Sequence, residues 1–248
     1  MKTIRYREAR GPEDLRLYAV GDVHGRLDLL QAMHERIADD LQKRPAADCR
    51  IIHLGDYTDR GPDSKGVLDF LVARSENDSR HIALMGNHDE GLLEFLATAD
   101  RDGLFAGNGG EATGRSYGVE IDFSSDEDAR AGRDALLEAM PEAHIAFLSS
   151  LPRSIAFGDF FFCHAGIRPG VPLDRQDPWD LAWIRWDFLD HTGLYEKVIV
   201  HGHTPVAWPD IQPNRIDIDT GAFKTGRLTA LVIDGGEKTL IEVSDSQW

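Results

Sequence analysis

The sequence is poor in cysteine, in basic residues and in long apolar runs. Cys49 and Cys163 are the two cysteines among 248 residues, so a disulfide scaffold is excluded and a reducing compartment is favoured. Residues 1–15 are charged throughout and lack the apolar segment of a signal peptide. No stretch approaches the ~18 apolar residues that a membrane span needs. We therefore expect a cytoplasmic protein with no membrane partner.

The shortage of basic residues also limits the partners. The chain has 27 basic and 43 acidic residues, for a formal net charge of −16. Proteins that bind nucleic acid generally carry a basic face, so we expect no nucleic-acid partner. Hydrophobic residues make up 42% of the chain, a globular composition. Because no repeat, linker or low-complexity segment interrupts the pattern, we predict a single domain over residues 1–248.

The first half of the chain repeats a strand–loop–helix pattern. Apolar runs at residues 15–20, 50–54 and 81–85 read as buried strands, and each is followed by apolar residues at helical spacing. Strands that alternate with helices in this way are typical of α/β architecture, in which right-handed crossovers place the strands in parallel.

The second half of the chain has a different pattern, in which short strands are joined by tight turns. Gly158-Asp159 and Asp234-Gly235-Gly236 are typical of hairpin turns. We expect these strands to form a second, more antiparallel sheet that packs against the first, and we interpret the segment 100–128 as an excursion. The predicted strands are 154–157, 160–163, 197–200, 215–218, 228–233 and 240–243.

Polar motifs follow the strands at five places. They are GDVHG (21–25), GDYTDRG (55–61), GNHD (86–89), CHAG (163–166) and HGHT (201–204). Ligands of open α/β sheets bind beyond the carboxyl ends of strands, so these motifs point to one region. Carboxylate and amide oxygens mixed with imidazoles suit Mn, Fe or Zn better than Ca or Mg alone. Two metals about 3.5–4 Å apart need one bridging carboxylate and roughly six ligands, which the motifs supply.

These motifs resemble the metallophosphoesterase superfamily, within it the phosphoprotein phosphatase family, and in particular its bacterial serine/threonine protein phosphatase branch. The resemblance covers residues 20–233, and GDYTDRG is its most specific element. It implies an α/β fold, a two-sheet mixed β-sandwich flanked by helices, with the active site at the C-terminal ends of the strands. Two positions depart from the eukaryotic pattern: Asp89 replaces Glu, and Ala165 replaces Gly. Neither change affects a predicted ligand atom.

The resemblance also implies a dinuclear metal site. The two divalent ions would be manganese, with iron or zinc as the other candidates. The implied ligands are Asp22 and His24 on the first metal, Asp56 as the bridge, and Asn87, His164 and His203 on the second metal. Pro205 stands where many superfamily relatives have a further histidine, so we do not expect His201 to be a ligand, although its spacing from His203 leaves this open. Structural or surface roles are expected for His34, His53, His81, His144 and His191.

Two metals would lower the pKa of a shared water, and the resulting hydroxide would attack phosphorus in line without a phosphoenzyme. In the resemblance, His88 protonates the leaving oxygen and Asp59 orients His88. Arg60 and Arg185 bind the phosphate oxygens together with Asn87.

Three tryptophans surround the second of these arginines. Trp179, Trp183 and Trp186 are spaced i, i+4 and i+7, which predicts one stripe on a single helix. Core packing is the simple interpretation of such a stripe. The alternative is a wall over the metal site that faces the substrate.

The functional hypothesis is a metal-dependent phosphomonoesterase that acts on phosphoserine or phosphothreonine in proteins. The first alternative is a symmetrical diadenosine-tetraphosphate hydrolase, a related family that shares GNHD but has no acid at the place of Asp59. Another small phosphomonoester, such as a tyrosine phosphate or a nucleotide, is a further alternative substrate. A non-catalytic scaffold is disfavoured, because no ligand of the motif set is missing.

Overall fold

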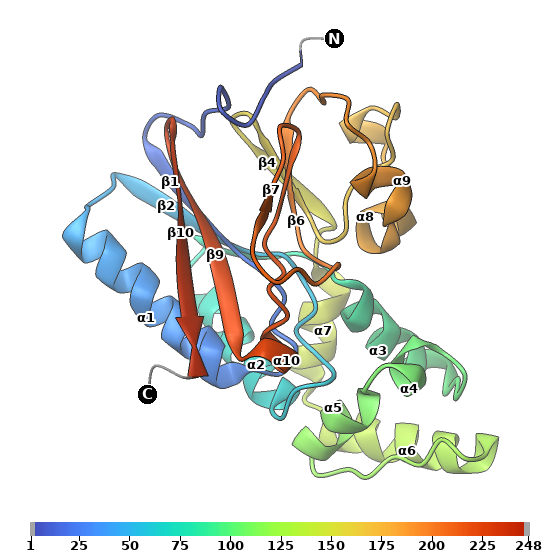
Figure 1. Ribbon diagram of the computed structural model, residues 1–248. Coiled ribbons are helices and arrows are strands. Elements are labelled where there is room, and N and C mark those ends of the chain that lie inside the picture. Colours follow the sequence, from blue (N-terminus) through green and yellow to red (C-terminus); the bar gives the residue numbers. More distant parts are fainter. Residues whose placement is uncertain (1–2, 246–248) are drawn as a thin grey trace.

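The computed structural model describes residues 3–245, and this part of the chain forms two five-stranded sheets (Figure 1). The first sheet has the order β10-β9-β1-β2-β3, and the second has the order β4-β5-β6-β8-β7. The strands of the first sheet are β1 (Leu15–Val20), β2 (Asp48–His53), β3 (His81–Ala83), β9 (Arg227–Asp234) and β10 (Glu237–Ser244). Those of the second are β4 (Ser154–Phe157), β5 (Phe160–Cys163), β6 (Val198–His201), β7 (Asp210–Ile211) and β8 (Arg215–Asp217).

The helices lie between and beyond these strands. They are α1 (Leu27–Lys43), α2 (Ser64–Asn77), α3 (Asn87–Thr98), α4 (Leu104–Gly107), α5 (Gly110–Ser116), α6 (Asp126–Ala139), α7 (Glu142–Ser150), the 3-10 turn η1 (Leu173–Arg175), α8 (Pro178–Trp183), α9 (Trp186–Leu189) and α10 (Ala222–Thr225). Among residues 3–245, none of these helices combines the length and the apolarity needed to cross a membrane.

The predicted two-sheet sandwich flanked by helices is confirmed, but the division of strands between the sheets was predicted wrongly. The hairpin β9–β10 joins the first sheet, where β9 runs antiparallel to β1. In the second sheet, β5, β6 and β8 are parallel to one another. Because residues 228–233 are buried on both faces, their pattern indicated a central strand but carried no information on which sheet would receive it.

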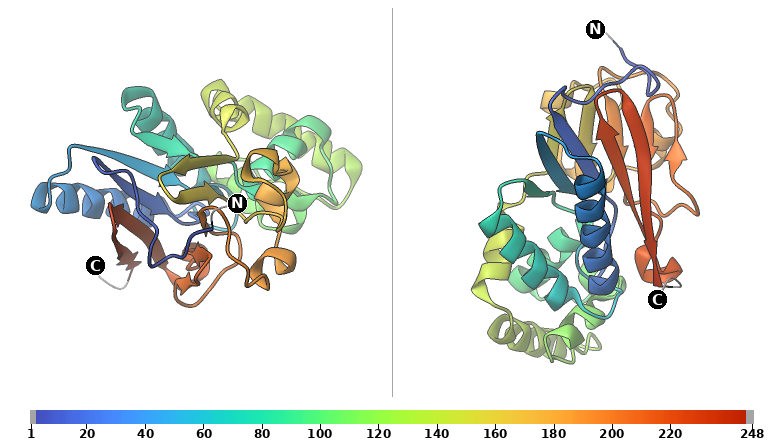
Figure 2. Two further views of the ribbon diagram at one scale, coloured as in Figure 1. Left: turned by 90° about the horizontal axis from the view of Figure 1, so that it is seen from above. Right: turned by 90° about the vertical axis from the view of Figure 1, so that its left-hand side faces the viewer.

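Each sheet buries one face against the other and covers its second face with helices. Leu17 and Ile52 of the first sheet pack against Phe162 and Val200 of the second in the inner layer. On the outer face of the first sheet, Met33 of α1 packs in a separate cluster, and Figure 2 shows α1 lying along that sheet. Helices α8 and α9 cover the outer face of the second sheet.

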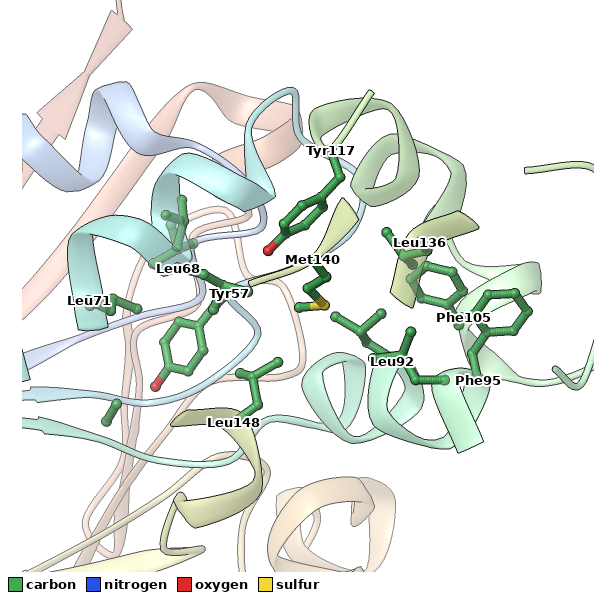
Figure 3. Close-up of a cluster of buried hydrophobic side chains, with 14 of the residues drawn as sticks. Tyr57, Leu68, Leu71, Leu92, Phe95, Phe105, Tyr117, Leu136, Met140 and Leu148 are labelled. Carbon is green, nitrogen blue, oxygen red and sulfur yellow. The ribbon is translucent and has the colours of Figure 1, made fainter. Parts of the chain in front are cut away.

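Helices α3 to α7 form a lobe below the sheets in Figure 1. Its interior is drawn in Figure 3, where Leu92 and Phe95 of α3 meet Phe105 of α4 and Leu136 of α6. The segment 100–128, interpreted from its composition as an excursion, therefore contains α4, α5 and the start of α6. Its short helices bury few side chains each, so their helical periodicity was too brief to recognise.

The predicted tryptophan stripe is not a single helix. Helix α8 ends at Trp183 and α9 begins at Trp186, because the two residues between them leave the helical region: Ile184 has ψ 143°, and Arg185 has φ −132° and ψ −97°. Trp179 and Trp186 are 58% and 68% exposed. Core packing is thus the wrong interpretation for both of these side chains.

Candidate active site

The five polar motifs lie at the C-terminal ends of β1, β2, β3, β5 and β6, so the edge at which the two sheets meet carries all of them. The backbone there is unusual. Among the described residues, six positions other than glycine have positive φ, and five of them belong to these motifs. They are His24, Asp56, Asp59, Arg60 and His203. A left-handed non-glycine residue costs about 1–2 kcal/mol, and such strain clusters where side chains must be aimed at a site.

Asp56 is shared by two groups of possible metal ligands. His24 and His88 each place one ring nitrogen within 4.8 Å of an Asp56 carboxylate oxygen, and His164 and His203 do the same in the second group. The His24 Nε2 atom lies 3.4 Å from Asp56 Oδ2, and the His164 Nε2 atom lies 3.3 Å from Asp56 Oδ1. The predicted bridging residue is therefore at the centre of the site.

Backbone carbonyls hold two of these imidazoles in place. The Nδ1 atom of His24 lies 2.8 Å from the carbonyl oxygen of Thr58, and that of His164 lies 3.0 Å from the carbonyl oxygen of Leu54. A hydrogen bond from Nδ1–H to a carbonyl fixes the tautomer and leaves Nε2 as the lone-pair donor. In both rings, Nε2 is the nitrogen that faces Asp56.

Asn87 joins the second group. Its Oδ1 atom lies 2.9 Å from His164 Nε2 and 2.8 Å from His203 Nδ1. Asn87 is the first residue of α3, directly after the turn that follows β3. The strand end thus delivers an amide oxygen to the same place as two imidazoles.

Asp22 is buried, and its two carboxylate oxygens differ in their hydrogen bonding. Oδ2 accepts the backbone N–H of His203 at 3.1 Å, whereas Oδ1 has no partner in the part of the chain that the structure describes. A Cβ atom on Gly202 would lie 2.1 Å from this Oδ1, so only glycine leaves space for it. A buried carboxylate oxygen without a partner is costly. Asp22 Oδ1 is therefore a free ligand atom in the interior.

Buried carboxylates dominate the electrostatics of the site. Burial, with Asp219 and Asp56 nearby, raises the pKa of Asp22 well above its ordinary value. Burial also raises the pKa of Asp219 to about 6 and that of Asp89 to about 7. Such a group of acids is stabilised by cations, which favour the ionised form.

Two of the imidazoles, those of His24 and His203, have the opposite shift. Burial lowers the pKa of His24 to about 3 and that of His203 to about 2, so both rings are neutral near pH 7. Neutral imidazole is the form that coordinates a metal, and carboxylate, amide and imidazole donors together suit divalent transition metals. The donor set therefore fits two divalent ions that share Asp56.

His88 and Asp59 form a buried pair. His88 Nδ1 lies 2.7 Å from Asp59 Oδ2, and Asp59 is fully buried. Its other oxygen accepts the hydroxyl of Thr113 at 2.8 Å, and the Asp59 N–H donates to the same hydroxyl oxygen at 2.8 Å. Thr113 comes from α5, in the segment interpreted as an excursion, and no local pattern in the sequence indicates its role.

Both predicted phosphate-binding arginines reach the metal-binding groups. The Arg60 guanidinium lies between two rings, with Nη1 3.0 Å from His24 Nε2 and Nη2 2.7 Å from His88 Nε2. Arg185 Nε lies 3.0 Å from His203 Nε2, in the second group. Each of the two groups of possible metal ligands is therefore contacted by one arginine.

Asp89 supports the backbone of the site, although the sequence indicates it only as a departure from the eukaryotic pattern. Its carboxylate accepts the backbone N–H of Asp56 at 2.8 Å and that of Tyr57 at 2.9 Å. A third residue of a helix commonly binds backbone donors in this way. Asp89 thus fixes the left-handed turn that positions the Asp56 side chain. Its place directly after Asn87-His88, at the start of a helix, is the pattern in the sequence that indicates this role.

His201 lies outside both groups of possible ligands among the described residues. Its ring packs edge-on against Phe188 at 5.0 Å, and its Nδ1 lies 3.8 Å from Asp217 Oδ2. Burial lowers its pKa to about 3. The ring is part of the second sheet's outer layer and does not face Asp56.

Comparison with known proteins identifies the family of the chain. The chain is 25% identical over 233 residues to an asymmetrical bis(5'-nucleosyl)-tetraphosphatase PrpE of Bacillus thuringiensis, with 86% of this chain and 88% of that protein covered. A solved "putative diadenosine tetraphosphatase" has a TM-score of 0.64 at 21% identity, covering 93% of this chain and 94% of its own. A protein serine/threonine phosphatase of Saccharomyces cerevisiae has a TM-score of 0.51 at 12% identity, covering 94% and 80%. A sequence model of the calcineurin-like phosphoesterase family matches residues 15–221. The chain therefore belongs to the calcineurin-like phosphoesterase family.

Proposed function

We propose that this chain is a metal-dependent phosphomonoesterase of the serine/threonine protein phosphatase type. The observation that carries the proposal is the buried His88–Asp59 pair, at 2.7 Å, beside a carboxylate that two groups of possible metal ligands share. A general acid next to a dinuclear site is what cleavage of a phosphate ester with a poor leaving group needs.

Six residues would hold the two divalent ions in this proposal. Bound divalent metals supply an activated water at neutral pH and neutralise charge that develops on the phosphoryl group. Manganese is the proposed metal, with iron or zinc as alternatives. The proposed ligands are Asp22, His24, Asp56, Asn87, His164 and His203.

The remaining residues act on the substrate. Asp59 accepts the Nδ1–H of His88 and orients the ring, whose Nε2 lies 2.7 Å from Arg60 Nη2. His88 is the proposed donor of the proton to the leaving oxygen. Arg60 and Arg185 contact one histidine in each group of possible metal ligands, where their guanidinium groups can bind the non-bridging phosphate oxygens. Asn87 supports the same phosphate through its side-chain amide.

A substrate panel tests the proposal. Phosphoserine, phosphothreonine and phosphotyrosine peptides are compared with dinucleoside polyphosphates, each with Mn, Fe and Zn, by measuring kcat/KM. We expect phosphoserine or phosphothreonine peptides to be the best substrates, with Mn the most effective metal. Faster cleavage of a dinucleoside polyphosphate than of any phosphopeptide would overturn the substrate assignment but leave the metal-dependent reaction in place.

Two observations favour a second candidate function, the cleavage of dinucleoside tetraphosphates. The curated relative described above is named for the asymmetrical reaction, whereas the sequence motifs had suggested the symmetrical one as the alternative. The indole of Trp183 lies 6.4 Å from the ring of His203, and Trp179 stacks on Trp183 at 6.3 Å with an interplanar angle of 11°. An exposed aromatic stack at the edge of a phosphate site suits a nucleobase.

The Trp179→Ala variant tests this candidate. If an adenine stacks on Trp179, kcat/KM for diadenosine tetraphosphate falls about 5- to 150-fold, the equivalent of 1–3 kcal/mol per stacked base. Hydrolysis of a phosphoserine peptide stays unchanged. Trp208→Ala is the matched control, because Trp208 is also exposed, at 68%. Equal loss on both substrates, or no loss on either, would count against base stacking at this position.

A further inference from the structure

Three histidines from separate elements meet on the outer face of the first sheet, and none of them belongs to the active site. They are His34 of α1, His53 of β2 and His81 of β3. One ring nitrogen of each lies within 4.8 Å of the others. No pattern in the sequence connects them, since each fits a helix or strand pattern on its own.

Sheet register and helix packing explain why they meet. His81 pairs with Ile51 in the parallel ladder between β2 and β3, and Ile51 and His53 are two residues apart. Side chains at i and i+2 of a strand point to the same face, so His53 and His81 share the face that α1 covers. His34 lies on the buried side of α1 and places its ring beside both.

The three rings are close and nearly parallel. The centroid of the His34 ring lies 5.2 Å from that of His53 and 5.3 Å from that of His81, with interplanar angles of 12° and 15°. A separation of about 5 Å is short enough for the rings to share one ion, with each nitrogen 2.0–2.1 Å from the metal. Because an imidazole binds a metal in its own plane, the stacked rings must turn about their Cβ–Cγ bonds to do so.

Four ring nitrogens of this cluster are buried and have no hydrogen-bond partner among residues 3–245: His34 Nε2, His53 Nδ1 and Nε2, and His81 Nδ1. His53 is fully buried and His34 is 8% exposed, and the side chain of His81 is 7% exposed. Buried polar atoms in native proteins nearly always have partners, so each such atom requires an explanation. Simple packing does not provide one, because an apolar side chain would fill the same space at no polar cost.

A cleft of about 550 Å³ opens onto the cluster, and His34 and His81 line it. An ion can therefore enter from solvent, and water can occupy a further coordination position. Both signs of charge face the cleft: Glu35, Arg74, Asp78 and Arg80 also line it. The carboxylate of Asp78 binds Arg80 at 2.6 Å and lies 3.8 Å from His81 Nε2, where it can orient that ring.

We propose that His34, His53 and His81 form a mononuclear site for a divalent transition metal, with zinc as the first choice and a water from the cleft as fourth ligand. Three imidazoles and one open position suit zinc, and copper, nickel and cobalt less specifically. Burial lowers the pKa of His34 to about 3 and that of His53 well below its ordinary value, so no proton competes with the metal. The ion ties α1 to β2 and β3, independently of the proposed phosphatase reaction.

Metal stoichiometry tests the site. Zinc binding by equilibrium dialysis is compared between the wild-type chain and the variants His34→Gln and His81→Gln, with His191→Gln as the control for removing a histidine elsewhere. We expect each cluster variant to bind one zinc fewer per chain and the control to bind as many as wild type. The readout is this difference, so it does not depend on how many ions the active site takes.

Crystals of the wild-type chain soaked in zinc give a second measurement that needs no variant. An anomalous peak at the zinc edge, between the three rings, is the expected result. Zinc also raises the Tm of the wild-type chain by more than that of His81→Gln, whose ring lies at the edge of the cluster. The proposal is overturned if soaked crystals show no peak there, or if folded cluster variants bind as much zinc as wild type.

Discussion

Replacement of Asp56 by asparagine is expected to lower metal-dependent phosphate release by about 10³-fold or more, on every substrate. Asp56 is the one carboxylate that both groups of possible ligands share, so its loss weakens two metal positions at once. Metal ions stabilise transition-state charge by several kcal/mol, and each 1.36 kcal/mol is a factor of ten in rate. Steady-state release from p-nitrophenyl phosphate, with Mn added, measures the effect.

Asp122→Asn is the matched control for this experiment, because Asp122 is an exposed carboxylate outside the five motifs. It removes the same charge and should leave the rate unchanged. Near-ultraviolet circular dichroism checks that Asp56→Asn is folded. A folded Asp56→Asn protein that keeps both its metal content and its rate would show that Asp56 is not the bridging ligand.

Replacement of His88 by asparagine is expected to depend on the leaving group. A serine alkoxide needs a proton as it departs, so kcat for a phosphoserine peptide should fall by about 10²- to 10⁴-fold, the usual contribution of a general acid. The p-nitrophenolate anion leaves without a proton, and the loss on p-nitrophenyl phosphate should therefore be much smaller. Comparing kcat for the two substrates isolates the proton-transfer role of His88.

Asp59→Asn gives the companion measurement. It removes the negative charge that lies 2.7 Å from His88 Nδ1 and keeps the shape of the side chain, so it should weaken proton donation by His88 and slow the phosphoserine peptide alone. Equal losses on both substrates in His88→Asn would point to a role in binding metal or phosphate instead, consistent with the short distance between His88 and Arg60.

The features that the sequence predicts well are local. Gly-Asp and Gly-Asn directly after apolar runs locate the ends of β1, β2 and β3, and parallel strands bring such ends to one edge. The predicted residues around Asp56 therefore come together as the motifs indicated. The resemblance adds which of these residues pair, something that residue type and spacing alone do not determine.

The features that the sequence does not predict depend on contacts between distant segments. Thr113 binds Asp59 across 54 positions, and a threonine in a glycine-rich stretch has no distinguishing pattern. His53 and His81 meet His34 only through the register of β2 with β3 and the seating of α1. The length and burial of β9 could be predicted from its sequence, but no local pattern indicates that it pairs with β1. Tertiary pairing decides each of these cases.

In the proposed enzyme, the guanidinium groups of Arg60 and Arg185 couple metal binding to anion binding. Arg60 donates to His24 Nε2 and Arg185 to His203 Nε2, and a metal ligated by either nitrogen takes the same lone pair. Metals bound at these nitrogens would displace both arginines, which would then be free to bind an anion. Since coupling of this kind is reciprocal, an anion that holds the arginines away from the histidines would strengthen metal binding by the same factor. Metal and phosphate would then bind cooperatively in the proposed enzyme.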